Sequence, residues 1–120
     1  MQRGRETNRR RTSVAAIFAT AAIALTACNS TPASPAQRGR VVYMSNCVVC
    51  HNADPRLSGS QGPPIAGSSR ELLEYRVLYA TYPPGYIPKR TTHAMKPLPH
   101  LKSQIDNLTA FLDEANKTDN

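Results

Sequence analysis

Beyond residue 38, hydrophobic residues gather in three segments, which long polar or proline-rich stretches separate. The most regular segment lies near the C-terminus, where apolar residues recur at spacings of four, three, three and one. This spacing places them on one face of a helix and predicts a helix over about residues 101–115. The apolar positions are Leu101, Ile105, Leu108, Phe111 and Leu112.

Two further apolar segments precede this helix. One runs from Arg70 to about Ala80 and follows Ser69, a residue type that caps helix N-termini. The other runs from Arg40 to His51, and its valines suit a strand as well as a helix. Glycine and proline between the segments predict loops over residues 52–69 and 82–99.

The first 27 residues differ in character from the rest of the chain. Five arginines precede residue 12, and residues 14–27 carry no charge. A basic segment followed by a short apolar one is typical of a secretory signal peptide. The apolar run is shorter than the about 20 residues that a membrane span needs, so an uncleaved anchor is the less favoured alternative.

The apolar run ends in Leu25-Thr26-Ala27-Cys28, which resembles the lipobox of a bacterial lipoprotein. The resemblance implies that Cys28 becomes the first mature residue and carries a lipid. Ordinary cleavage after Ala27 is the alternative. Residues 28–38, rich in small and polar residues, predict a flexible tether. The expected organisation is a lipoprotein signal peptide at 1–27, a lipid-anchored tether at 28–38 and a folded domain at 39–117.

The net charge of +7 belongs mostly to the signal peptide. Its removal takes away five arginines and one glutamate, which lowers the net charge to +3. No run of basic residues remains in the mature chain, and we therefore expect no nucleic-acid partner.

A folded part of roughly 80 residues with three short helices has too small a core to be stable without a staple. Cys47-Val48-Val49-Cys50-His51 suggests the staple. In a helical turn, positions i and i+3 share a face, so both sulfurs can add to the vinyl groups of one haem while His51 faces the iron. This pattern is typical of c-type haem attachment. It also favours a helix, with Met44 in the apolar core, over the strand.

Three other interpretations of the cysteine pair are less favoured. A structural zinc site needs four ligands, and His93 and His100 are the only remaining histidines that could complete one. A thioredoxin-like redox pair needs a βαβ scaffold, which the pattern of elements does not predict. A simple structural disulfide is the third alternative. Haem is attached to such motifs outside the cytoplasm, which agrees with the export signal.

These residues resemble class I cytochromes c over roughly Gly39 to Leu112. Gly39, Tyr43 and Cys47 have the family's spacing of a glycine, an aromatic residue and the first haem cysteine. The resemblance implies that Gly39 lets the last helix cross the first closely, with Phe111 packed at the crossing. The expected fold is all-α: a small cytochrome c fold with three main short helices and long loops around one covalent haem.

The resemblance also implies how the iron is held. The stretch Gly62-Pro63-Pro64-Ile65-Ala66-Gly67 matches the family's Gly-Pro-x-Leu-x-Gly, which implies a hydrogen bond from His51 to the carbonyl of Pro63. Met95 is the expected sixth ligand, opposite His51. His93 is the alternative and would give a lower reduction potential. His100 is expected to face solvent.

A cluster of tyrosines and cations precedes Met95, and Tyr86 and Arg90 are its candidate haem-binding residues, through the propionates or at a docking rim. The resemblance implies a non-enzymatic electron carrier with one haem c and its iron. We expect it in a bacterial cell envelope, anchored by Cys28 to a membrane and facing the periplasm or exterior, with redox proteins as partners. The alternatives are a haem subunit of an oxidoreductase complex and a sensor or peroxidase-like protein with an open sixth position.

Overall fold

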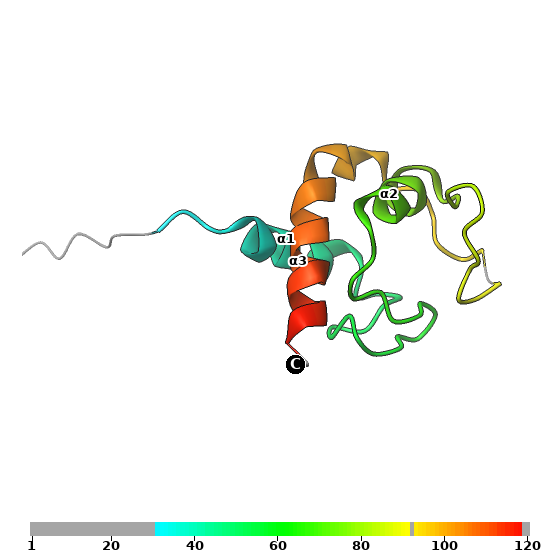
Figure 1. Ribbon diagram of the computed structural model, residues 1–120, viewed down its shortest axis with the longest axis horizontal. Coiled ribbons are helices and arrows are strands. Elements are labelled where there is room, and N and C mark those ends of the chain that lie inside the picture. The colour runs from blue at the N-terminus through cyan, green and yellow to red at the C-terminus, as the bar shows by residue number, and fades with distance from the viewer. Residues whose placement is uncertain (1–30, 92, 119–120) are drawn as a thin grey trace, which may run out of the picture. The chain divides into compact units, whose positions relative to one another are not determined.

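The computed structural model describes residues 31–91 and 93–118, so the predicted signal peptide and Cys28 lie outside the described residues. The elements are α1 (Pro35–Asn46), α2 (Arg70–Leu73), the π-helical turn η1 (Glu74–Leu78), the 3-10 helix η2 (Pro99–Gln104) and α3 (Ile105–Lys117). Every element in this part of the chain is helical, and long loops join α1 to α2 and η1 to η2 (Figure 1). The prediction of an all-α fold with three main helices is confirmed. None of these helices is long and apolar enough to cross a membrane.

Helix α1 begins earlier than the sequence analysis predicts. Ser34 and Gln37 form a reciprocal capping box, in which Ser34 Oγ accepts from the backbone N–H of Gln37 at 3.1 Å and Gln37 Oε1 accepts from that of Ser34 at 2.8 Å. Pro35 at the first helical position suits the start of a helix. The predicted tether is therefore wrong for residues 35–38, because a local cap starts the helix where the composition alone predicts a flexible chain.

Helices α1 and α3 cross closely at Gly39. A Cβ at this position would lie 1.9 Å from the backbone oxygen of Asn107 and 2.9 Å from Cβ of Phe111. One turn further along α1, Tyr43 is fully buried, and its ring centroid lies 5.2 Å from that of Phe111. The crossing that the family resemblance implies is therefore present.

The segment after Ser69 is less regular than a single α-helix. Ser69 caps it as predicted, because its Oγ accepts from the backbone N–H of Leu72 at 3.2 Å. After Leu73 the helix widens into the π-helical turn, in which the consecutive residues Val77 and Leu78 are both buried. The chain then leaves the helix through Ala80 in a left-handed conformation with a φ of 55°. The spacing of apolar residues does not indicate a π-helical turn. The sequence analysis therefore predicts one regular helix from Arg70 to about Ala80.

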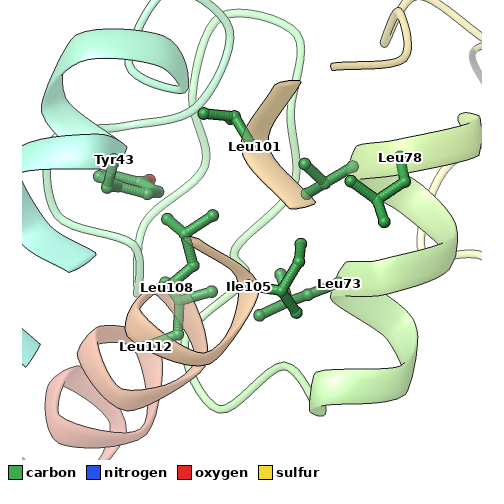
Figure 2. Packing of buried hydrophobic residues seen from close by; sticks show 8 residues of the cluster. Tyr43, Leu73, Leu78, Leu101, Ile105, Leu108 and Leu112 are labelled. Atoms are coloured by element: carbon green, nitrogen blue, oxygen red, sulfur yellow. The ribbon is translucent and has the colours of Figure 1, made fainter. Parts of the chain in front are cut away.

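The core is small and lies between the helices. Within the described residues eight hydrophobic side chains are buried: Tyr43, Leu73, Val77, Leu78, Leu101, Ile105, Leu108 and Leu112. Figure 2 shows Tyr43 of α1 beside Leu108 and Leu112 of α3, with Leu73 and Leu78 approaching from α2 and η1. Met44, expected in the core, is 39% exposed because α1 turns it away from α3.

Candidate functional site

A cavity of about 460 Å³ adjoins the core. It lies within the roughly 300–1,000 Å³ range of small-molecule and cofactor pockets. All three helical segments contribute apolar side chains to its lining: Tyr43, Leu72, Leu73, Val77, Leu108 and Leu112. Several of these residues are also core residues, so the cavity and the core share their walls.

The cysteine pair sits where α1 ends. Cys47 caps the helix and donates its backbone N–H to Tyr43 O at 2.8 Å. The backbone N–H groups of Cys50 and His51 both donate to Cys47 O, at 3.1 and 2.9 Å, so the chain makes one further turn after the helix. This turn brings Cys47, Cys50 and His51 to the wall of the cavity. Both cysteines are free thiols.

His51 is oriented by the loop that follows it. Its Nδ1 lies 3.2 Å from Pro63 O. A carbonyl oxygen only accepts hydrogen bonds, so Nδ1 carries the proton and Nε2 is left as a metal ligand. Gly62 makes the close approach possible, because a Cβ there would lie 2.3 Å from His51 Nδ1. The contact that the family resemblance implies is present.

Burial shapes the protonation of these side chains. Burial lowers the pKa of His51, and Arg76 and Arg90 add to this effect, while the hydrogen bond to Pro63 opposes it. The neutral imidazole, which is the metal-binding form, is therefore favoured at neutral pH. Burial also raises the pKa of the Cys47 thiol to about 11.

The protonation of Cys47 bears on the rival interpretations. A reactive redox cysteine needs a lowered thiol pKa, and Cys47 has a raised one. Among the residues that the structure describes, no three His, Cys, Asp or Glu side chains lie together as a metal site, which counts against zinc. The two thiols are not joined in a disulfide.

Met95 and His93 differ clearly in their surroundings. Met95 is half-buried, packs against the core and lines the cavity. His93 is exposed, and it does not belong to the cavity lining. The segment after Met95 is fastened to η1, because the backbone N–H of Leu98 donates to Val77 O at 2.6 Å. His100 is exposed, as predicted.

A polar cluster lines another part of the cavity. The rings of Tyr82 and Tyr86 are stacked with centroids 5.3 Å apart. The Arg76 guanidinium lies 4.2 Å from the centroid of Tyr82, and its Nη1 donates to Ala80 O at 2.7 Å. Four cations line the cavity, whereas no Asp or Glu appears among its described lining residues. They are Arg76, Lys89, Arg90 and Lys96.

Arg76 was missed by the sequence analysis. It lies four residues after Leu72 and three after Leu73, and at helical spacing it shares their face. A cation on an otherwise apolar helix face is therefore the sequence feature that identifies it.

The donor set and the cavity fit one kind of group. The apolar cavity is lined by two thiols, an imidazole with a free Nε2 and a thioether. Cations also line it and could bind acidic substituents of a bound group. These features suit a covalently bound iron porphyrin, and they define a small helical protein built around such a group.

The family model of cytochrome c matches residues 36–116, which is most of the chain, so the chain belongs to the cytochrome c family. Members of this family bind haem c and its iron covalently and generally carry electrons, and the chain is thus a haem c electron-transfer protein. Neither the comparison with curated proteins nor the comparison with solved structures gave a match.

Proposed function

We propose that the chain carries single electrons through one haem c joined by thioethers to Cys47 and Cys50, with iron held by His51 and Met95. Haem c supplies, when bound, an iron that takes up and returns one electron. The observation that carries the proposal is that the two thiols, the Pro63-bonded imidazole and the thioether of Met95 all line one apolar cavity.

The chain's own residues control this chemistry. The apolar lining excludes water, and the hydrogen bond to Pro63 makes His51 a more basic ligand. A thioether in the sixth position raises the reduction potential. If His51 and Met95 both hold the iron, no iron position would remain for a substrate, which favours an electron carrier over a sensor or a peroxidase-like protein.

The polar cluster suits the haem propionates. Tyr86 and Arg90 line the cavity, as does Arg76 on the face of Tyr82. A guanidinium is always charged and has five N–H donors, so it holds carboxylates well. We assign Arg76 and Arg90 to the propionates, with Tyr86 beside them.

The proposed location of the protein rests on its N-terminal sequence. A lipid on Cys28 anchors the domain to a membrane of a bacterial cell envelope, facing the periplasm or exterior, through a tether that ends at Ser34. The tether keeps the domain at a high local concentration near its partners. We expect these to be redox proteins that meet the exposed haem edge in small, brief contacts.

Mass spectrometry of the protein exported from a haem-attaching bacterial host tests this proposal. We expect the mass of one haem on the peptide that contains Cys47 and Cys50, with a pyridine haemochrome of the two-thioether type. The mass spectrum should also show a lipid on Cys28 and no residues before Cys28. Cysteines joined in a disulfide or bound to zinc, without haem, would refute the cytochrome interpretation.

The sixth ligand is tested by two variants. Met95→Ala should abolish the weak absorption band near the red end of the visible spectrum that marks a Met-bound ferric haem, and should lower the reduction potential. His93→Ala is the matched control, because His93 is exposed outside the cavity lining, and it should leave both unchanged. The opposite pattern would make His93 the ligand.

A further inference from the structure

The short segment Gln61–Pro64 is held at every carbonyl. Gln61 O accepts from Nη1 of Arg90 at 2.8 Å, and Pro64 O accepts from Nζ of Lys89 at 2.9 Å. Between them, Gly62 O accepts from the backbone N–H of Gly59 at 3.0 Å, and Pro63 O lies 3.2 Å from His51 Nδ1. The carbonyl that orients His51 therefore lies between two carbonyls that cations hold, one residue before Pro64 O and two residues after Gln61 O.

The same segment has few other means of fixing itself. Pro63 and Pro64 have no N–H to donate. The N–H groups of Gln61 and Gly62 both donate to Cys50 O, at 3.1 and 2.9 Å, which fastens only the first half of the segment. The second half, which contains the His51 acceptor, has backbone support only just beyond its end, where the N–H groups of Ile65 and Ala66 donate to Pro55 O at 2.8 and 3.0 Å. The side chain of Lys89 adds a hydrogen bond to Pro64 O from another loop.

Lys89 and Arg90 come from the loop that carries Met95. Hydrogen bonds from charged donors are stronger than neutral ones, and the two cations bind carbonyls three residues apart in the same segment. Among the described residues, Arg56 and Arg70 form ion pairs, whereas these two cations do not. The two bonds thus join the loop of the sixth ligand to the segment that orients the fifth.

We propose that Lys89 and Arg90 are positioning residues that hold the Pro63 carbonyl on His51 and link the loop of Met95 to that segment. They act through the backbone of Gln61 and Pro64. This inference rests on the proposed His51 and Met95 ligation, and it goes beyond any role of Arg90 at a propionate, because Lys89 has the equivalent bond.

The test uses the haem-bearing protein with Lys89→Gln alone and with Lys89→Gln combined with Arg90→Gln. Lys89→Gln is the more informative single change, since no propionate role is assigned to Lys89. The matched control combines Arg40→Gln with Lys102→Gln, which removes the same charge at exposed positions outside the cavity lining. The exchange of Lys89 for Arg and Arg90 for Lys keeps both charges and should restore wild-type behaviour.

Two measurements report separately on Met95 and on the contact between His51 and Pro63. Imidazole binding to the ferric protein would report displacement of Met95, and its rate should rise about threefold in Lys89→Gln and about tenfold in the double variant. Exchange of the His51 Nδ1 proton with solvent, followed by NMR on the reduced protein, should accelerate in parallel. The Arg40 and Lys102 control should match the wild type in both.

The outcomes separate this inference from the proposed function. A haem-bearing wild type whose Lys89 and Arg90 variants keep both rates within twofold of the control overturns the positioning role alone. Faster imidazole binding with an unchanged His51 proton also overturns it, since the link to Pro63 would then be missing. A wild type without haem overturns the proposed function, and this inference with it.

Discussion

Alanine at position 39 is expected to destabilise the protein by about 3 kcal/mol, the upper end of what overpacking costs. In most helices a glycine-to-alanine change is stabilising by about 0.5–1 kcal/mol, because alanine loses less conformational entropy on folding. Here the added Cβ would lie 1.9 Å from the Asn107 oxygen. That atom is backbone and has no rotamer to change, so α1 and α3 must separate. Denaturant unfolding of the haem-bearing Gly39→Ala protein measures the change.

Two companion variants sharpen this prediction. Arg40→Ala, on the exposed side of the same helix, should change the free energy of unfolding by less than about 0.5 kcal/mol. Combining Gly39→Ala with Phe111→Ala should not restore stability, because the nearest obstacle is the backbone of Asn107 and the ring of Phe111 is itself packed on Tyr43. A stabilising effect of Gly39→Ala would show that the helices cross further apart.

Features with a local cause could be predicted from the sequence. The apolar stripe of α3 has a regular spacing, and Ser69 is a cap that acts within its own turn. The contact between Pro63 and His51 came from a short motif of fixed spacing. In the first two cases residues close together in sequence determine the geometry, whereas the contact of Pro63 with His51, twelve residues apart, was implied by the family resemblance.

The errors arose where packing or capping competed with composition. Small and polar residues from Pro35 to Arg38 suggest a flexible chain, but the Ser34 cap accepts from the backbone N–H of Gln37 and a helix starts there. Met44 belongs to an apolar sequence pattern, yet the crossing at Gly39 fixes the orientation of α1 and leaves it partly exposed. The exposure of Met44 depends on a neighbour in space that the sequence pattern does not identify, whereas the capping box of Ser34 and Gln37 is a local signal that the sequence analysis missed.

Some residues of the site could likewise be predicted from the sequence, and others could not. The cysteines and His51 lie within five residues and could be found from their spacing. Arg76 reaches the cavity from a different helix, and its place on the Tyr82 ring depends on a chain that leaves the π-helical turn through Ala80. The bonds of Lys89 and Arg90 to carbonyls 25 and 29 residues away are likewise invisible in a sequence pattern.

The shared walls of core and cavity explain why this chain can be so short. Tyr43, Leu108 and Leu112 are almost completely buried and also line the cavity. A bound porphyrin would therefore extend the hydrophobic core, and thioethers from Cys47 and Cys50 would tie it to the end of α1. A covalent staple of this kind is what a domain with eight buried hydrophobic residues needs.

The same reasoning predicts the largest effect on the site itself, from Gly62→Ala. The new Cβ would lie 2.3 Å from Nδ1 and 2.4 Å from Cε1 of His51, so the imidazole must turn away from Pro63. The cysteine motif is unchanged, and haem should still be attached. Its absorption spectrum should shift from low-spin to high-spin, and the free energy of unfolding should fall by about 2 kcal/mol or more.

Gln61→Ala is the matched control for this change, because the bonds of Gln61 within the loop use its backbone and its side chain is exposed. It should keep the low-spin spectrum of the wild type. Since the loop at Gly62 is fastened to Cys50 O and Pro63 has a fixed φ, the loop has little room to retreat from the imidazole. A low-spin Gly62→Ala protein of unchanged stability would mean that the loop does move, and that the glycine is not what permits the His51 orientation.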